Sequence, residues 1–335
     1  MTNSISARRP PSRLALLFEG GSGQLGLFVI VVAFWILFSA LAPGFLSRFN
    51  LNSLGRSLAI DIVVGFSQMA ALATGGINLS VGAIGVCSLM TTGYLLQVAG
   101  LPIPVAIVGG LALGAAQGWI NGFAIARSGV NSFFITLATA SLFAGGMLIA
   151  TRATPFNGLP PELGAFGKAN VAGVPTLLIV AAAIGAALFV LFGYSLAGRR
   201  ILATGANARA AAMSGVPVNR VIMLAHTLSG LLAAAAGVML LAKLGAALPS
   251  VAGDEWLLPS FLGPVLGGTL LSGGLVSVIG TAIGATLVTT IRSGLLVLQV
   301  GNFWLQLFLG IVLLLAVMIE RYRSVVAARR ALARQ

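Results

Sequence analysis

Long apolar segments alternate with short polar or small-residue breaks along nearly the whole chain. The breaks contain glycine, proline or arginine, and most of the segments are about as long as the roughly 20 residues that a helix needs to cross a hydrocarbon core about 30 Å thick. The pattern predicts an all-α polytopic integral membrane protein with about ten transmembrane helices. The predicted spans are 24–42, 57–75, 80–98, 102–125, 132–150, 174–196, 221–241, 258–272, 275–298 and 303–319.

The eighth segment, 258–272, is shorter than the others and contains several helix-breaking residues. Pro259, Pro264, Gly267 and Gly268 interrupt its apolar pattern. Such a segment is typical of a broken or re-entrant helix that is buried in protein at membrane depth. The sequence alone leaves open whether 258–272 is a full crossing or a re-entrant one.

Composition and charge agree with a membrane location. Hydrophobic residues make up 58% of the chain and charged residues 7%, where a soluble domain has about 25%. The net charge of +13 is distributed unevenly between the two sides of the predicted topology, as the positive-inside rule expects. The predicted cytoplasmic arginines are Arg8, Arg9, Arg13, Arg127, Arg199, Arg200, Arg209, Arg220, Arg321, Arg323, Arg329, Arg330 and Arg334. Those predicted outside are Arg48, Arg56, Arg152, Lys168 and Lys243, with Arg292 near the outer end of the ninth span.

This bias places both termini in the cytoplasm and divides the chain into three parts. A cytoplasmic tail, 1–23, precedes a transmembrane domain, 24–319, and a basic cytoplasmic tail, 320–335, follows it. The first span also imitates a cleavable signal peptide, because it follows basic residues and ends in Ala-Leu-Ala at 40–42. Its apolar stretch is longer than a typical signal core and the imitated cleavage site is late, so we interpret it as a membrane helix.

The sequence carries no chemistry for catalysis or for energy conversion. Neither Lys168 nor Lys243 lies in a phosphate-binding GxxxxGK[ST] loop, and six acidic residues leave no plausible ATPase domain. The single histidine, His226, has no carboxylate or cysteine near it in sequence, and Cys87 has no partner for an intrachain disulfide. We therefore predict no enzyme, no metal site and no cofactor in this chain, and any ATP is bound by another subunit.

Small residues predict close helix packing in two spans. Gly110, Gly114, Gly118 and Gly122 recur every four residues and so lie near one helix face, where a neighbouring backbone can approach. Glycines at 280 and 284 repeat the spacing once. The stripe fits either a contact within the chain or an interface between subunits.

Polar residues within the apolar spans indicate a path for a solute, because they are costly in a bilayer. Asp61 lies one turn into the second span, close enough to the surface for Arg56 or water to satisfy it, and Gln68 and Gln117 are similarly ambiguous. The stretch TGGINLSVGAIG, 74–85, interrupts the apolar pattern more strongly. It is typical of the helix breaks at which transporters build sites, and a simple tight turn is the alternative.

Four motifs in order resemble the permease subunits of bacterial ABC importers for monosaccharides, of the ribose and xylose type. GGINLSVG (75–82) is similar to the family's GGIDLSVG, and SFFITLAT (132–139) is similar to FIVTLGT. GRRILATGANARAAAMSGVPVNR (198–220) resembles the family's GRxxxAxGxNxxAAxxSGI loop. GGTLLSGGLVSVIGTAIGA (267–285) resembles GGTSLxGGxGSVxGTxxGA, and the resemblance runs from about residue 50 to 317.

The resemblance implies a cytoplasmic coupling loop, 197–220, that docks on an ATP-binding subunit. The matching residues are Gly205, Asn207, Ala210, Ala211, Ser214 and Gly215. The residues agree independently, because ARAAAM favours a helix and Gly215 with Pro217 ends it. A merely solvated basic loop is the alternative.

The resemblance also implies alternating access in the inner membrane. Two permease subunits, either two copies or a sister pair, enclose a path fed by a periplasmic binding protein, and membrane lipid surrounds them; no nucleic acid is involved. The path residues it implies are Asn78, Ser80, Phe133 and Thr136. Asn78 replaces the family's usual Asp, Ala138 a Gly and Leu257 a Glu, which puts the family's charge pairing in doubt.

Other interpretations stay open at this point. Asp254 and Glu255, just before the eighth span, are candidates for contact with the binding protein. An ion-coupled secondary carrier would use Asp61 as its relay and would need no docking loop. Neither the sugar or polyol carried nor the choice between homodimer and heterodimer follows from the sequence.

Overall fold

The computed structural model describes residues 21–250 and 254–299, together with residues 304, 306–308, 310, 311, 314 and 318. Helices dominate these residues, and the one small sheet is an antiparallel hairpin in which Val171 pairs with Val174. The first helices are α2 (Gly21–Leu41), α3 (Arg48–Leu72), α4 (Val81–Gln97), α5 (Ile103–Ser128), α6 (Ser132–Thr151) and α7 (Pro161–Lys168). The hairpin strands are β1 (Asn170–Val171) and β2 (Val174–Pro175). Then follow α8 (Thr176–Tyr194), α9 (Leu196–Ala206), α10 (Ala208–Met213), α11 (Val218–Leu244), the 3₁₀ turn η1 (Asp254–Trp256), α12 (Leu257–Leu266) and α13 (Val278–Val297).

Six of the described helices are long and apolar enough to cross a membrane, which fits the predicted all-α polytopic protein. They are α2, α5, α6, α8, α11 and α13. α3 is also long, at 25 residues, whereas α4 and α12 are shorter apolar helices of 17 and 10 residues. Most of the predicted tenth span, 303–319, the first 20 residues of the predicted N-terminal tail and the predicted C-terminal tail lie outside the described residues.

Side-chain caps explain where several helices begin. Ser47, Asn131, Ser195, Asn207 and Ser277 each accept a hydrogen bond from a backbone N–H in the first turn of the helix that follows. Such a cap satisfies one of the amides that the first turn leaves without a helical partner. The starts of these five helices therefore follow from local sequence. The tertiary contacts that hold the helices together are not needed to explain them.

Some predicted boundaries were wrong. α3 begins at Arg48 rather than near residue 57, because Ser47 caps it. Its first turns mix polar and apolar residues, so the apolar pattern does not mark them as part of a span. α7, the β1–β2 hairpin and α9 had no counterpart among the predicted spans. These elements are short and contain charged or turn-forming residues, so a search for apolar spans passes over them.

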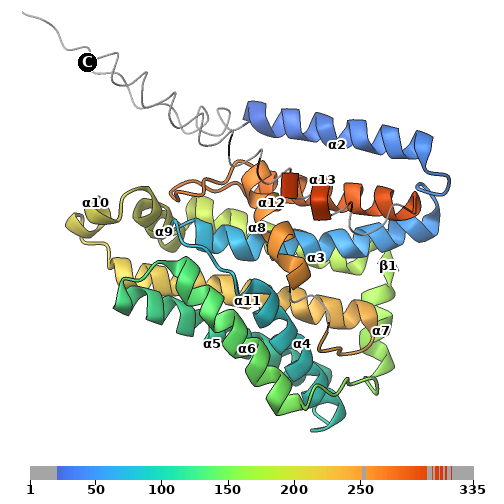
Figure 1. Ribbon diagram of the computed structural model, residues 1–335, viewed down its shortest axis with the longest axis horizontal. Helices are drawn as coiled ribbons and strands as arrows, with labels where there is room; N and C mark the ends of the chain where they lie inside the picture. Colours follow the sequence, from blue (N-terminus) through green and yellow to red (C-terminus); the bar gives the residue numbers. More distant parts are fainter. Residues whose placement is uncertain are drawn as a thin grey trace, which may run out of the picture.

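The helices lie side by side and the connecting elements gather at two opposite ends (Figure 1). α9 and α10 lie at one end, and α7 with β1 lies at the other. α3 runs through the middle, packed against α8, α11, α12 and α13. Seventeen of its residues are buried, and so few exposed positions indicate a central helix surrounded by its neighbours.

The glycine stripe of α5 packs within the chain. Gly114, Gly118 and Gly122 lie against α11, and Gly110 lies against α4. A Cβ on Gly118 would lie 3.0 Å from the Cα and N of Gly230 and even closer to the carbonyl oxygen of His226. A Cβ on Gly122 would lie 2.7 Å from the Cα of Met223. The structure thus favours an intramolecular contact for the stripe, one of the two roles that its spacing allowed. Gly280 and Gly284 of α13 pack in the same way on the backbone of α12, against Gly267 and Gly263.

Candidate functional site

The GGINLSVG motif forms a break deep inside the helix bundle. Eight residues, 73–80, separate the end of α3 from the start of α4, so the alternative of a simple tight turn was wrong. Asn78 Nδ2 donates to Ser229 Oγ at 2.8 Å. Ser229 lies 11 residues after the start of α11, about 16 Å along that helix, so the break reaches well inside the bundle.

A connected set of uncharged polar side chains surrounds this break. Ser80 Oγ donates to Asn78 Oδ1 at 2.6 Å, and Asn121 Nδ2 of α5 donates to Ser80 Oγ at 2.8 Å. Ser67 Oγ of α3 donates to the Ser229 carbonyl oxygen at 2.8 Å. All five residues are buried, so three parts of the chain that are far apart in sequence, namely α3 with the break, α5 and α11, meet here through neutral hydrogen bonds.

The sequence prediction identified part of this set. It named Asn78 and Ser80 as path residues, but it did not connect Ser67, Asn121 or Ser229 with them. Asn121 carries a recognisable signal, since a neutral amide within an apolar glycine-rich helix needs a buried partner. Its partner, Ser80 in the break before α4, is fixed only by the tertiary fold.

The second motif contributes Thr136 but not Phe133 to the break. Thr136 is buried, and its Oγ1 accepts from Leu79 N at 3.0 Å, while Ser132 Oγ accepts from Ile77 N at 2.8 Å. These bonds satisfy backbone amides that the interrupted helix leaves free. Phe133 is 41% exposed on the surface of α6, where its ring contacts Phe134. The structure therefore brings Asn78, Ser80 and Thr136 together and leaves Phe133 apart.

Several buried polar atoms near the break have no hydrogen-bond partner among the described residues. They include both amide atoms of Gln68, Oδ1 of Asn121 and both ring nitrogens of His226. His226 lies beside the break, because a Cβ on Gly76 would be 2.9 Å from its Nε2. The two amide groups are uncharged, and the imidazole can be uncharged. Each of the three groups offers hydrogen-bonding atoms that the described residues leave unused.

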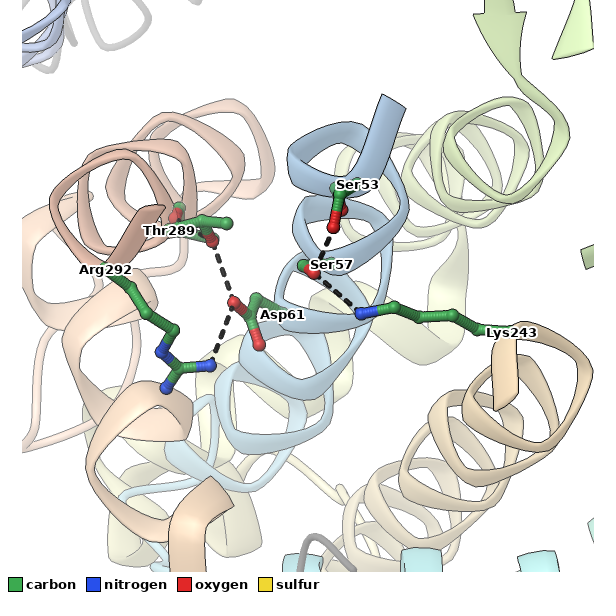
Figure 2. A network of polar contacts seen from close by, with 7 residues as sticks. Ser53, Ser57, Asp61, Lys243, Thr289 and Arg292 are labelled. Carbon is green, nitrogen blue, oxygen red and sulfur yellow. Dashed lines mark hydrogen bonds and ion pairs between the residues drawn. The ribbon is translucent and has the colours of Figure 1, made fainter. Parts of the chain in front are cut away.

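A second, charged network lies toward the α7 end of the bundle (Figure 2). Asp61 Oδ2 of α3 accepts from Thr289 Oγ1 at 2.8 Å and lies 3.7 Å from Arg292 Nη1, both on α13. Lys243 of α11 approaches from the opposite side and donates to Ser57 Oγ at 2.7 Å. The carboxylate of Asp61 therefore has a fixed cation and a fixed hydrogen-bond donor.

Of the two partners predicted for Asp61, Arg56 was wrong. Arg56 donates instead to the backbone carbonyl of Lys168, at the end of α7. Arg56 and Asp61 are five residues apart on one helix and so do not face each other. The actual partner, Arg292, is more than two hundred residues away in sequence, and only the packing of α13 on α3 brings it close.

The predicted coupling loop folds into two short helices. α10 spans Ala208–Met213, the ARAAAM stretch that was expected to be helical, and Gly215 follows it with φ +80°. Asn207 Oδ1 caps α10 by accepting from Ala210 N at 3.0 Å, and Ser214 Oγ donates to the Ala210 carbonyl oxygen at 3.0 Å. The local prediction is confirmed, whereas helical α9 before it was missed.

Two of the matched loop residues pack against neighbours and the other four lie at the surface. Ala211 is buried, and Gly205 packs against the backbone after α3. The exposed four are Asn207, Ala210, Ser214 and Gly215. Met213, which the sequence reasoning did not single out, is also at the surface and is 86% exposed. A largely exposed methionine at the end of a short helix is a candidate for a docking contact, because methionine adapts its shape to a partner surface.

The acidic pair before α12 lies in the η1 turn. Glu255 is exposed, and the side chain of Asp254 lies outside the description. The next residue, Trp256, is buried, and a Cβ on Gly85 of α4 would fall within contact of its ring. The tryptophan thus anchors the turn and leaves Glu255 at the surface.

Comparison with known proteins decides the family. Residues 52–317 match the family described as the permease component of branched-chain amino acid transport systems. The chain belongs to this permease family. It is a multi-pass protein of the plasma membrane, and membership in a family of transport components confirms the prediction that it is not an enzyme.

Individual relatives resemble this permease over almost its whole length. The ribose import permease protein RbsC of Bacillus subtilis strain 168 is 37% identical over 310 residues, covering 92% of this chain and 95% of that protein. The D-allose transport system permease protein AlsC of Escherichia coli K12 is 31% identical, covering 96% and 97%. The autoinducer 2 import system permease protein LsrD of Escherichia coli SMS-3-5 is 34% identical, covering 83% and 86%. No solved structure gives a significant match.

Proposed function

We propose that this permease is the transmembrane subunit of an ATP-driven importer for a monosaccharide or a related polyol. The observation that carries the proposal is the similarity to ribose and allose permeases over more than nine tenths of the chain. A separate ATP-binding subunit energises the importer, and a periplasmic binding protein delivers the sugar. This chain supplies the path and the contact with the ATP-binding subunit.

The polar break suits such a cargo chemically. Asn78, Ser80 and Thr136 are neutral, and His226 beside the break has unused hydrogen-bonding atoms. Hydroxyl groups of a sugar are donors and acceptors without charge, so neutral amides and hydroxyls can pair with them without leaving a buried charge. These groups support a path at the break for an uncharged solute.

A second permease, either another copy or a sister chain, completes the path in this proposal. Only 6% of the most apolar stretch of α6 is buried, so this chain leaves most of that helix uncovered. Phe133 lies on that exposed helix and would line the path from the subunit boundary. Asn78 in place of the family's usual Asp favours a sister chain, and a second permease species in the purified complex would support this.

The coupling loop, 197–220, faces the cytoplasm in this proposal, as do both termini. Arg199, Arg200, Arg209 and Arg220 are exposed around α9 and α10. Arg127 lies at the end of α5, and α5 is antiparallel to α11, so it belongs to the same end of the bundle. This clustering of arginines at one end supports the orientation through the positive-inside rule.

The turn before α12 is proposed to touch the binding protein. Replacing Glu255 by lysine is expected to weaken binding of the periplasmic protein, and the loss is expected to shrink as salt is raised, because exposed charges act through a screened field. Binding of the purified binding protein to the permease complex in nanodiscs, titrated at low and high salt, measures this. An unchanged affinity at low salt would remove Glu255 from the interface.

The alternative, an ion-coupled carrier, requires Asp61 to take up and release a proton or an ion. Its carboxylate is held by Thr289 and Arg292, which favours a structural role. Asp61→Asn is expected to cost about 1–2 kcal/mol of stability, a modest loss because Arg292 is partly exposed and asparagine still accepts from Thr289. ATP-driven uptake per folded complex is expected to persist. Loss of an ion-driven uptake, with folding intact, would support the carrier.

The proposed function is tested by isolating the permease with its partners. The chain is tagged, extracted gently from its native membrane and analysed by mass spectrometry, and the complex is reconstituted in vesicles with the co-purifying binding protein. ATP-dependent uptake of radiolabelled ribose, allose or xylose, together with a co-purified ATP-binding subunit, is the expected result. A chain that is recovered alone and takes up solute without ATP on an ion gradient would overturn the proposal.

A further inference from the structure

Three segments far apart in the sequence meet backbone to backbone at the α9 end of the bundle. They are the residues that follow α3 (73–76), the end of α9 (205–206) and part of the loop between α12 and α13 (272–274). Gly274 N donates to the Ala73 carbonyl oxygen at 3.1 Å. We call this contact the glycine junction; its members are Ala73, Gly75, Gly205, Ala206, Gly273 and Gly274.

The junction leaves no room for a side chain at its glycine positions. A Cβ on Gly205 would collide with the Ala73 carbonyl oxygen and lie 2.5 Å from Gly274 N. A Cβ on Gly273 would lie 2.5 Å from Gly75 N and 3.0 Å from the Cα of Gly205. Because the neighbours are backbone atoms, no side-chain rotation can relieve these contacts, and the three segments are fitted together as rigid pieces.

Each segment belongs to one of the sequence motifs and continues into a different part of the structure. Residues 73–76 continue into Asn78 and Ser80, where the polar break begins. The loop after α12 connects the short, broken α12 to α13. Gly205 lies two residues before Asn207, which caps α10, so α9 and α10 are joined almost without a linker.

We propose that the glycine junction transmits the movement of the coupling loop to both interrupted segments, the break before α4 and the α12–α13 loop. A displacement of α9 has to displace 73–76 and 272–274, since they are in direct backbone contact with it. The inference rests on the proposed function, because it assumes that an ATP-binding subunit moves α10. It adds the residues through which that movement reaches the path.

Two pairs of variants test the transmission from opposite sides of the junction. Gly274→Asn introduces a side chain against Ala206, and asparagine tolerates the φ of +84° at this position. Its control is Gly268→Asn, which changes a glycine of the same loop that has φ +89° and open space around it. Gly205→Ala introduces a methyl group against Ala73, and its control, Gly193→Ala, lies at the end of α8 with open space. Gly274 lies outside the coupling loop, so its variant replaces no residue of the docking surface.

Three quantities are measured for each purified complex reconstituted in vesicles. They are the amount of co-purified ATP-binding subunit, the rate of ATP hydrolysis, and the uptake of whichever of radiolabelled ribose, allose or xylose the wild-type complex transports. Gly274→Asn and Gly205→Ala are expected to assemble and hydrolyse ATP but to take up about tenfold less sugar per ATP. Both controls are expected to behave as the wild type.

The possible results separate the inference from the function on which it rests. Wild-type sugar uptake per ATP in both junction variants would overturn the transmission role. Loss of assembly and hydrolysis in both variants, in proportion to uptake, would also overturn it, because the junction would then be a folding contact. A wild-type complex without ATP-dependent uptake would instead refute the proposed function itself. If Gly205→Ala alone fails to assemble, Gly274→Asn decides.

Discussion

Replacing Met213 by aspartate is expected to abolish ATP-driven uptake and to release the ATP-binding subunit from the purified complex. Met213 is 86% exposed at the tip of α10, where a groove on that subunit would bury it. A buried apolar anchor of this kind contributes at least about 2 kcal/mol to binding, roughly a thirtyfold change in affinity, and a charge in its place would also have to be desolvated. Co-purification and uptake in vesicles measure the effect.

The matched control for Met213→Asp is Met213→Leu, which keeps an apolar side chain of similar volume. It is expected to retain most of the uptake, since volume-conserving apolar exchanges are tolerated best. Because Met213 contributes little to the packing of this chain, both variants are expected to fold with wild-type yield. Normal co-purification of the ATP-binding subunit with Met213→Asp would contradict the assignment of α10 as the docking element.

Replacing Gly118 by valine is expected to prevent most of the protein from folding. The Cβ and the two methyl groups would enter the contact between α5 and α11, where the neighbours are backbone atoms of His226 and Gly230. Overpacking a core costs about 1–3 kcal/mol where side chains can adjust, and we expect at least about 3 kcal/mol here because the two helices would have to separate. Against a total stability of about 5–15 kcal/mol, that is a large loss. Folded yield and thermal unfolding in detergent measure it.

Gly146→Val provides the comparison for Gly118→Val. Gly146 lies within α6 and has nothing within 4 Å of where a Cβ would be placed, so the same substitution adds volume without a collision. It is expected to fold with nearly wild-type yield. If both variants are equally unstable, the loss stems from the helix propensity of valine, and the close approach of α5 to α11 would not be its cause.

The sequence by itself determined the membrane character, most helix positions and the local form of the proposed docking element. These properties depend on interactions within one segment, namely apolar length, capping side chains and the glycine and proline that end a helix. The ARAAAM helix after Asn207 and the short α12 in a glycine- and proline-rich segment follow from such local rules. The permease family was also identifiable from four motifs in order.

Only the tertiary structure decided which residues meet. Asp61 pairs with Arg292 rather than Arg56, Asn121 reaches Ser80, and the glycines at 75, 205 and 273 come into backbone contact. Each of these contacts joins helices whose relative rotation and depth depend on packing over the whole bundle, and no local pattern records that rotation. Sequence therefore predicts which side chains need a partner, and the arrangement of the helices determines which partner each of them receives.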